Sequence, residues 1–313
     1  MDTLRIFLAG ASGTLGRRIV PQLIARGHHV TGTTRSRADE LRALGAEPVV
    51  VDPLDAVALR EAVVRAEPDV VVHQLTALAG IGMARNFDKV FALTNRFRTE
   101  GTDYLIAAAR AAGARRLVWQ SYAGWPYARD GGTLKSEDDP LDPDPPADAR
   151  ESLAAIRHLE AAVTGAPDME GYVLRYGGFY GPGTTLEDGA THVELIRKRR
   201  FPLGGDGRGI WSFVHIDDAA AATVAAIEGA GPPGVYNVVD DDPAPVGEWL
   251  PALAKRVGAP PPRHLPGWLT RLAGGAQAHS MMTRTRGASN AKAKRELGWQ
   301  PTHTLLDSVG REV

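Results

Sequence analysis

Three glycines near the start of the chain constrain its fold more than any other feature of the sequence. The apolar run 4–9 leads directly into Gly10, Gly13 and Gly16, and an amphipathic segment over 17–26 follows. Strand, glycine turn and helix in this order are typical of a dinucleotide-binding turn, where the backbone approaches a pyrophosphate and the helix N-terminus faces it. The turn residues that we predict to bind a dinucleotide are Gly10, Ser12, Gly13, Thr14, Leu15 and Gly16.

The end of the second predicted strand, 29–34, indicates which dinucleotide would bind. It lies about 20 residues beyond the glycine turn, where such folds contact the adenosine ribose. NAD-binding versions use Asp or Glu there, whereas this chain has Thr33, Thr34 and Arg35, and no acid before Asp39. A guanidinium binds a 2′-phosphate that a carboxylate would repel, so Thr34 and Arg35 predict NADP, with NAD as the less favoured alternative. In that alternative, Arg35 is a solvated loop residue and the backbone contacts the ribose.

Two further strand ends supply candidates for the same site. The strand predicted at 48–51 ends at an Asp-Pro pair, and the strand predicted at 69–74 is a near-continuous apolar run. Because ligands bind at the carboxyl ends of parallel strands, we expect both ends to line the dinucleotide site, with Asp52 near an adenine amino group. The alternative is that Asp52 caps the following turn, since Asp-Pro favours turns. These candidates are Asp52, Pro53, Leu54, Gln74, Leu75 and Thr76.

The alternation of strand and helix patterns up to residue 177 predicts the fold class. Strands separated by helices are typical of an α/β fold, here a Rossmann-type, doubly wound parallel sheet. After Gly177 the chain becomes rich in turns, with strands at 210–214 and 235–239 and a proline-rich stretch near 260–262. We predict a Rossmann domain over 1–177, with 210–239 packing back onto it. Residues 178–209 and 240–313 then form a smaller C-terminal α/β substrate domain.

Composition excludes several classes of function. The 313 residues carry a formal net charge of −1, which gives no electrostatic basis for binding nucleic acid or an acidic membrane. There is no cysteine, and the nine histidines show no metal-ligand spacing with acids. No apolar run approaches the roughly 20 residues of a membrane span, and no leader precedes the first strand. We therefore expect a cytoplasmic protein with a small-molecule substrate, no metal, and no nucleic-acid or membrane partner.

The strand predicted at 116–120 leads into hydroxyl and aromatic side chains, where we expect the chemistry. Ser121, Tyr122 and Tyr127 follow it closely. In an open α/β sheet this edge faces the ligand, so we predict these three as catalytic residues of a substrate site. The alternative is ordinary packing of the loop beneath the second domain.

Five further motifs follow the glycine turn in a recognisable order. They are Asp52-Pro53-Leu54, Val72-His73-Gln74, Leu174-Arg175 through Tyr180-Gly181-Pro182-Gly183, Phe213-Val214-His215-Ile216-Asp217-Asp218-Ala219, and Lys294-Arg295-Glu296-Leu297-Gly298-Trp299-Gln300-Pro301. With the glycine turn, they make nearly the whole chain resemble the extended short-chain dehydrogenase/reductases, also called the NAD-dependent epimerase/dehydratase family. The resemblance implies a Rossmann domain, a bound NAD(P), a C-terminal substrate domain, and often a homodimer formed through helices like those predicted at 87–112 and 149–163.

The sequence departs from this family where its chemistry is expected. The resemblance implies a catalytic Tyr four residues before a Lys in the fifth helix, often with a Glu four residues after the Lys. Glu160 fits that Glu, which places Ile156 at the Lys position and Ser152 at the Tyr position. A shift by one residue offers Leu153 and Arg157 instead, and no Tyr-x-x-x-Lys occurs anywhere in the chain.

The missing pair leaves three hypotheses. In the first, Tyr122 or Tyr127 supplies the proton, helped by Ser121, with Arg157 as a candidate cation to lower the Tyr pKa. In the second, the cofactor transfers hydride while the protein only positions the substrate and excludes water. In the third, the chain is a non-redox lyase or isomerase, or a non-catalytic NADP-binding sensor. We favour an NADP(H)-dependent oxidoreductase that transfers hydride to or from a small carbonyl or alcohol.

Overall fold

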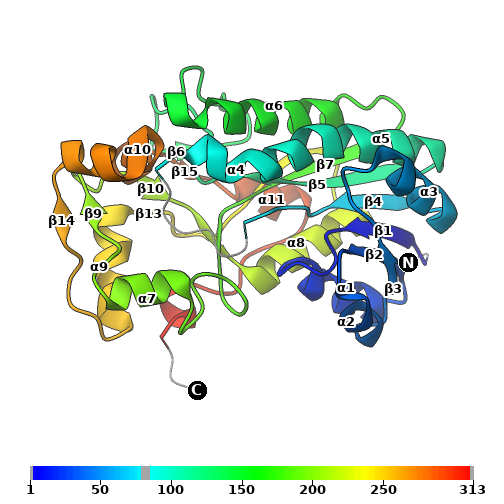
Figure 1. The fold of residues 1–313 in the computed structure, drawn as a ribbon, viewed down its shortest axis with the longest axis horizontal. Helices are drawn as coiled ribbons and strands as arrows, with labels where there is room; N and C mark the ends of the chain where they lie inside the picture. The colour runs from blue at the N-terminus through cyan, green and yellow to red at the C-terminus, as the bar shows by residue number, and fades with distance from the viewer. Residues whose placement is uncertain (1–2, 79–84, 311–313) are drawn as a thin grey trace.

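The computed structural model describes residues 3–78 and 85–310, and a seven-stranded sheet lies at its centre (Figure 1). The order of the strands is β12-β7-β5-β4-β1-β2-β3, and every neighbouring pair is parallel. The strands are β1 (Arg5–Ala9), β2 (His29–Thr34), β3 (Glu47–Val50), β4 (Val70–His73), β5 (Arg116–Tyr122), β7 (Glu170–Tyr176) and β12 (Gly234–Val238). The predicted doubly wound parallel sheet is confirmed, with its switch point between β1 and β4.

Alternating side chains of the strands build a separate core on each face of the sheet. In β1, Ile6 and Leu8 belong to one buried cluster, whereas Phe7 and Ala9 belong to another. The first cluster is covered by α1 (Gly16–Ala25), α2 (Ala38–Ala43), α8 (Ile216–Glu228) and α11 (Ala291–Glu296). The second is covered by α3 (Ala56–Ala66), α5 (Thr102–Ala111) and α6 (Arg150–Thr164). Because both faces are covered, the central strands β1 and β4 are buried along nearly their whole length.

The helical pattern predicted over 87–112 is observed as three consecutive segments. A π-helical turn, η1 (Phe97–Gly101), separates α4 (Phe87–Arg96) from α5. Turns of this kind are rare and occur frequently at functional sites. Here the turn carries Arg98, whose side chain is buried.

The second part of the molecule lies at one end, beyond the strands of the large sheet (Figure 1). Tyr180, Phe201, Phe213 and Trp249 are the larger side chains of its own buried cluster. Its strands pair as β8 (Gly178–Tyr180) with β11 (Phe213–His215), β9 (Leu203–Gly204) with β14 (His264–Leu265), β10 (Ile210–Trp211) with β13 (Ala244–Pro245), and β6 (Leu134–Lys135) with β15 (Gly287–Ala288). Its helices are η2 (Ala147–Ala149), α7 (Thr191–Arg197), α9 (Val246–Arg256), α10 (Gly267–Thr283) and α12 (Leu305–Ser308).

Helix α10 was not predicted from the sequence. It follows the prolines at 260–262 and contains Gly274 and Gly275, and Gly275 adopts a left-handed φ of 88° that kinks the helix. A kinked helix does not keep one apolar face in register, so the periodic signal is weak. Across the described part of the chain, no helix is long and apolar enough to cross a membrane. The division into two domains and the homodimer stay predictions.

Candidate functional site

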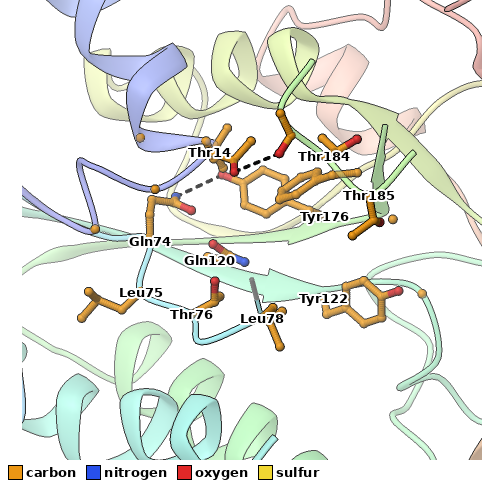
Figure 2. A pocket seen from close by; sticks show the side chains of 18 of the residues that line it. Thr14, Gln74, Leu75, Thr76, Leu78, Gln120, Tyr122, Tyr176, Thr184 and Thr185 are labelled. Carbon is orange, nitrogen blue, oxygen red and sulfur yellow. Dashed lines mark hydrogen bonds between the residues drawn. The ribbon is translucent and has the colours of Figure 1, made fainter. Parts of the chain in front are cut away.

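A pocket with a volume of about 990 Å³ opens at the carboxyl ends of the central strands (Figure 2). Gln74, Gln120 and Tyr122 lie along the strand ends, and Thr184 and Thr185 of the second part lie opposite them. Among the described residues that line the pocket there is no acid. The charged residues that line it are Arg17, Arg35, Arg37 and Arg98. This positive lining favours anionic ligands.

The glycine turn lines one part of the pocket. Gly10 has a left-handed φ of 93°, and a Cβ at this position would lie 2.6 Å from the carbonyl oxygen of Gln74. A Cβ on Gly16, where α1 begins, would lie 2.4 Å from the carbonyl oxygen of Gly10. Only glycine therefore fits at either position. The N–H groups of Gly10 and Gly13 are bonded within the protein, to Thr33 Oγ1 and to the carbonyl oxygen of Gly10. A phosphate would meet the N-terminal end of α1. All six predicted turn residues line the pocket: Gly10, Ser12, Gly13, Thr14, Leu15 and Gly16.

The end of β2 is fixed by its threonines and leaves Arg35 free to bind a ligand. Thr33 Oγ1 accepts a hydrogen bond of 3.0 Å from the N–H of Gly10, and Thr34 Oγ1 accepts one of 2.9 Å from the N–H of Arg37. Arg35 is exposed, lines the pocket, and makes no ion pair with any described residue. Thr34 and Arg35 thus lie where the sequence analysis expects the ribose to bind.

The other predicted dinucleotide residues divide into two groups. Those that line the pocket are Pro53, Gln74, Leu75 and Thr76. Asp52 and Leu54 do not line it, because Asp52 Oδ1 instead accepts a 2.9 Å hydrogen bond from the N–H of Leu54. Asp52 therefore caps the turn after β3, which is the alternative that its Asp-Pro sequence left open.

Gln74 provides a free acceptor at the centre of the pocket. Its Nε2 donates to the hydroxyl of Tyr176 at 3.2 Å, and that hydroxyl lies 2.7 Å from Thr223 Oγ1. Its Oε1 is buried and has no partner in the described structure. A buried acceptor without a partner is costly, so a hydroxyl or amide group of a bound dinucleotide would complete it. The glycine turn, Arg35 and Gln74 together fit an NAD(P) molecule.

Two of the three predicted catalytic hydroxyls lie outside the pocket. Ser121 Oγ donates to Glu160 Oε1 at 2.6 Å, and Glu160 also accepts from Arg175 at 2.6 and 2.8 Å. The Tyr127 hydroxyl donates to Asn237 Oδ1 at 2.6 Å and accepts from Arg175 Nη1 at 2.8 Å. These buried hydroxyls complete one network around the Glu160–Arg175 ion pair. Neither hydroxyl lines the pocket, and this placement favours the alternative of ordinary packing.

The pleat of β5 explains why Ser121 is turned away. The strand runs through Tyr122, so Gln120 and Tyr122 point to one face and Ser121 points to the other. Gln120 and Tyr122 line the pocket, and Ser121 does not. Tyr122 is thus the one of the three predicted catalytic hydroxyls that lines the pocket, and its catalytic role stays a prediction.

The cation beside Tyr122 is Arg98 rather than Arg157. Burial raises the pKa of Tyr122 to about 12, and the charge of Arg98 opposes that rise. Arg157 instead donates to the carbonyl oxygen of Asp142 and does not line the pocket. Arg98 was not predicted from the sequence. Helical spacing gives no signal for it, because Arg98 lies in the π-helical turn η1, where the ordinary α-helical spacing is interrupted.

The two residues that Glu160 aligns with the family's Tyr and Lys both lie outside the pocket. Ser152 and Ile156 are 0% exposed and do not line the pocket. Ser152 Oγ donates to Asp88 Oδ1 at 2.6 Å, and the same carboxylate accepts from the N–H groups of Glu151 and Ser152 at 3.0 and 2.9 Å. Asp88 therefore caps α6 from α4, and Ile156 packs in an apolar cluster with Trp125 and Leu153. Neither position offers a proton donor.

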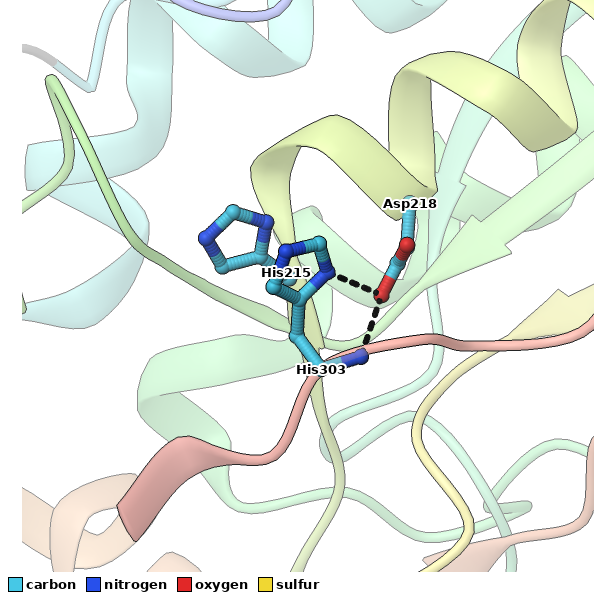
Figure 3. A group of neighbouring side chains, drawn as sticks. All are labelled: His215, Asp218 and His303. Carbon is cyan, nitrogen blue, oxygen red and sulfur yellow. Dashed lines mark hydrogen bonds and ion pairs between the residues drawn. The ribbon is translucent and has the colours of Figure 1, made fainter. Parts of the chain in front are cut away.

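A separate cluster joins the start of α8 to the C-terminal segment (Figure 3). His215, Asp218 and His303 place ligand atoms within 4.8 Å of one another. Burial alone would raise the pKa of Asp218, but its hydrogen bonds from Thr302 and His303 outweigh this and lower the pKa. Both carboxylate oxygens already accept protein donors at 2.7 to 3.1 Å, and the two rings stack at 3.8 Å. We assign this cluster a structural role.

Comparison with known proteins agrees with this geometry. The model of the NAD dependent epimerase/dehydratase family matches residues 6–238. A 3-diazoavenalumate denitrifying reductase of Streptomyces sp is 46% identical, over 99% of this chain and 100% of that protein. A 2-alkyl-3-oxoalkanoate reductase of Stenotrophomonas maltophilia is 29% identical, over 82% of this chain and 77% of that protein.

Solved structures show the same fold at lower identity. The UDP-glucose 4-epimerase of Thermotoga maritima, solved with UDP-glucose, has a TM-score of 0.77 at 20% identity, over 97% of this chain and 96% of that chain. The Bordetella bronchiseptica enzyme WbmG, solved with NAD and UDP, has a TM-score of 0.75 at 21% identity, over 98% and 92%. The family match and the relative of full length together show that this chain belongs to the NAD-dependent epimerase/dehydratase family, the extended short-chain dehydrogenase/reductases.

Proposed function

We propose that this protein is an NADPH-dependent reductase that replaces the diazo nitrogen of a small aromatic compound with hydrogen. One observation carries the proposal: Ser152, at the position aligned with the usual proton donor, is buried and does not line the pocket, whose walls are aromatic. The family resemblance implies that the missing Tyr would protonate a reduced carbonyl. A reduction that needs no proton fits this site better.

The proposed cofactor is NADP(H). Arg35 supports it, because this side chain lines the pocket at the ribose end without a counter-ion among the described residues. A guanidinium there would bind a 2′-phosphate, and no described acid lines the pocket to accept from a 2′-hydroxyl. The glycine turn would hold the pyrophosphate, and Gln74 Oε1 would accept from the cofactor at the centre of the pocket.

The proposed substrate follows from the Streptomyces relative that is 46% identical to this chain. That relative is named a denitrifying reductase of a diazo compound. When bound, NADPH supplies the hydride: its C4–H bond breaks, an aryl C–H bond forms, and the C–N bond breaks with its electrons leaving on N2. An aryldiazonium ion and NADPH thus give the arene, N2 and NADP⁺. No proton enters this balance, so the chain needs no acid at position 152.

The walls of the pocket suit an aromatic ring. Phe87 stacks on Phe91 at 4.3 Å and meets the edge of Trp125 at 5.3 Å, and all three rings line the pocket. Aromatic walls exclude water, which would protect a diazonium group from hydrolysis. The raised pKa of Tyr122 keeps its hydroxyl protonated at neutral pH. Tyr122 is therefore not the phenolate that would couple with a diazonium ion.

Reduction of a carbonyl is the second candidate function. It is favoured by one observation: Tyr122 lines the pocket near the charge of Arg98, so its hydroxyl is available as a replacement acid. Relatives named as reductases of oxo compounds support the same candidate. In this case Tyr122 would donate the proton that a reduced carbonyl oxygen requires.

The test compares the two substrate classes with the same purified protein. An aryldiazonium carboxylate and a panel of ketones are each mixed with NADPH or NADH, and NADPH oxidation and N2 release are followed. We expect release of N2 with NADPH, well above the rate of a mixture without protein. Turnover of ketones alone would favour the second candidate. If neither class oxidises NADPH, a non-redox lyase or isomerase, or a cofactor sensor, becomes the better account.

A further inference from the structure

Arg98 is a buried cation of the pocket that dinucleotide binding does not use. It is 6% exposed and lines the pocket, yet it forms no ion pair within the described part of the chain. The hydrogen bond that it donates is long, 3.4 Å from Nη1 to Asn95 Oδ1. Burial lowers the pKa of Arg98 to about 10, so it remains charged at neutral pH. A buried guanidinium without a counter-ion is costly unless a ligand supplies one.

Glu160 is the acid whose charge acts on Arg98, and it acts from a distance. Its carboxylate accepts two hydrogen bonds from Arg175 and one from Ser121, and it forms no ion pair with Arg98. Glu160 therefore offsets the charge of Arg98 only in part, and the guanidinium keeps room for an anionic ligand at the pocket wall.

The residue at the family's Tyr position supports Arg98 indirectly. Ser152 Oγ accepts from Asn95 Nδ2 at 3.0 Å, and Asn95 Oδ1 faces Arg98. The π-helical turn η1 carries Arg98 directly after α4, which carries Asn95. Ser152, which aligns with the family's Tyr, thus orients the Asn95 side chain, and Asn95 in turn positions Arg98.

The rings beside Arg98 indicate what its ligand carries. The guanidinium carbon lies 6.0 Å from the ring centre of Phe91, which stacks on Phe87. We propose that Arg98 binds the carboxylate of an aromatic acid whose ring lies against Phe91 and Trp125, so that the pocket selects anionic aromatic substrates. The proposal for Arg98 rests on the proposed function in one respect: the part of the pocket lined by Arg98, Phe91 and Trp125 is taken as the substrate site. A carboxylate fits the planar fork of arginine in bidentate fashion.

A phosphate of the cofactor is the other source of an anion for Arg98. Arg17, Arg35 and Arg37 already line the phosphate-binding end of the pocket, whereas Arg98 lies with Tyr122 and the aromatic residues. The substrate carboxylate is therefore the better match. Measuring the binding of cofactor and aromatic acid separately distinguishes the two sources.

The experiment measures binding and not turnover. Protein saturated with NADP⁺ is titrated calorimetrically with cinnamate and with cinnamamide, which share a shape and differ in charge. We expect the native protein to bind cinnamate at least about 10-fold more tightly, and Arg98→Met to lose this preference. Arg98→Lys should retain part of it. Arg96→Met is the matched control, because Arg96 is a neighbouring exposed residue paired with Glu100.

The outcomes separate the possibilities. Equal affinity for cinnamate and cinnamamide in the native protein overturns the proposal, and so does an unchanged preference in Arg98→Met. Weaker NADP⁺ binding by Arg98→Met, with its cinnamate preference intact, assigns Arg98 to the cofactor instead. If Arg98→Met does not fold, Arg98→Gln decides by the same criteria. Arg98-dependent cinnamate binding without diazonium turnover would contradict the proposed function and leave this subsite standing.

Discussion

At the scale of single residues, two side chains that line the pocket carry the proposed function. We propose that Arg35 sets the choice of dinucleotide, and Tyr122 is the one of the three hydroxyls predicted to be catalytic that lines the pocket. The sequence analysis found Arg35 because its distance from the glycine turn is fixed by the fold. It could not separate Tyr122 from Ser121 and Tyr127, because the direction of each side chain depends on where β5 ends.

Arg35→Ala is expected to weaken NADPH binding by about 10- to 100-fold, since it removes a charge-assisted contact to the 2′-phosphate. NADH binding should stay within about twofold, because NADH has no such phosphate. Fluorescence titration with both cofactors measures this. Arg42→Ala is the control, since Arg42 is exposed and paired with Asp39 at 2.6 Å. Equal losses for NADPH and NADH would show that Arg35 does not read the phosphate.

Tyr122→Phe separates the two candidate functions. If hydride alone is needed, the rate of N2 release from a diazonium substrate should stay within about threefold of the native rate. Ketone reduction should fall by about 100-fold or more if Tyr122 donates the proton. Initial rates with each substrate class measure the difference. A parallel fall in both rates would mean that Tyr122 positions the substrate instead of acting as an acid.

At the scale of elements, the structure shows what patterns of residues can and cannot predict. The parallel strands and the helices of the first half follow from their apolar patterns, and the glycine turn lies where predicted. Helix α10 was missed because its glycines interrupt the pattern. The placement of Arg98 was missed because the π-helical turn at 97–101 has no signature in residue type, although it brings this cation to the pocket.

The cap that α4 provides for α6 is a testable link between elements. Asp88→Ala removes the acceptor for two backbone N–H groups and the hydroxyl of Ser152, so we expect the free energy of unfolding to fall by about 1–3 kcal/mol. Urea denaturation measures the change. Asp103→Ala breaks an exposed contact to His158 of the same helix and should cost under about 1 kcal/mol. Equal losses in the two variants would contradict the capping role.

At the scale of the whole molecule, the central sheet fixes both stability and site. The strand order places the carboxyl ends of β1, β4 and β5 side by side at one edge of the sheet. The alternation of strand and helix patterns in the sequence was sufficient to predict this edge as the ligand site. The identity of the substrate was not predictable in this way, because loops and helices distant in sequence combine to form that end of the pocket. The motifs in the second half of the chain indicate its family and not its chemistry.

His73 at the end of β4 predicts how stability depends on pH. Burial lowers its pKa to about 4, whereas the unfolded chain has the ordinary value of 6.5. The folded state thus binds this proton less readily, so its stability is complete above pH 6.5 and decreases as the pH falls toward 4. The loss from His73 is at most about 3 kcal/mol. The urea midpoint of the native protein should fall as the pH decreases toward 4 and approach the midpoint of His73→Gln, which lacks this titrating group. Midpoints of the two proteins that fall in parallel would contradict the role of His73.

The central claim is that hydride replaces nitrogen in this pocket without a proton from the protein. The most direct measurement follows an aryldiazonium carboxylate with NADPH that carries deuterium as the transferred hydride, in ordinary water, by mass spectrometry of the gas and the arene. We predict one N2 for each NADPH oxidised and deuterium on the ring carbon that lost nitrogen. Oxidation of NADPH without N2, or an arene whose new hydrogen comes from the solvent, would contradict the account.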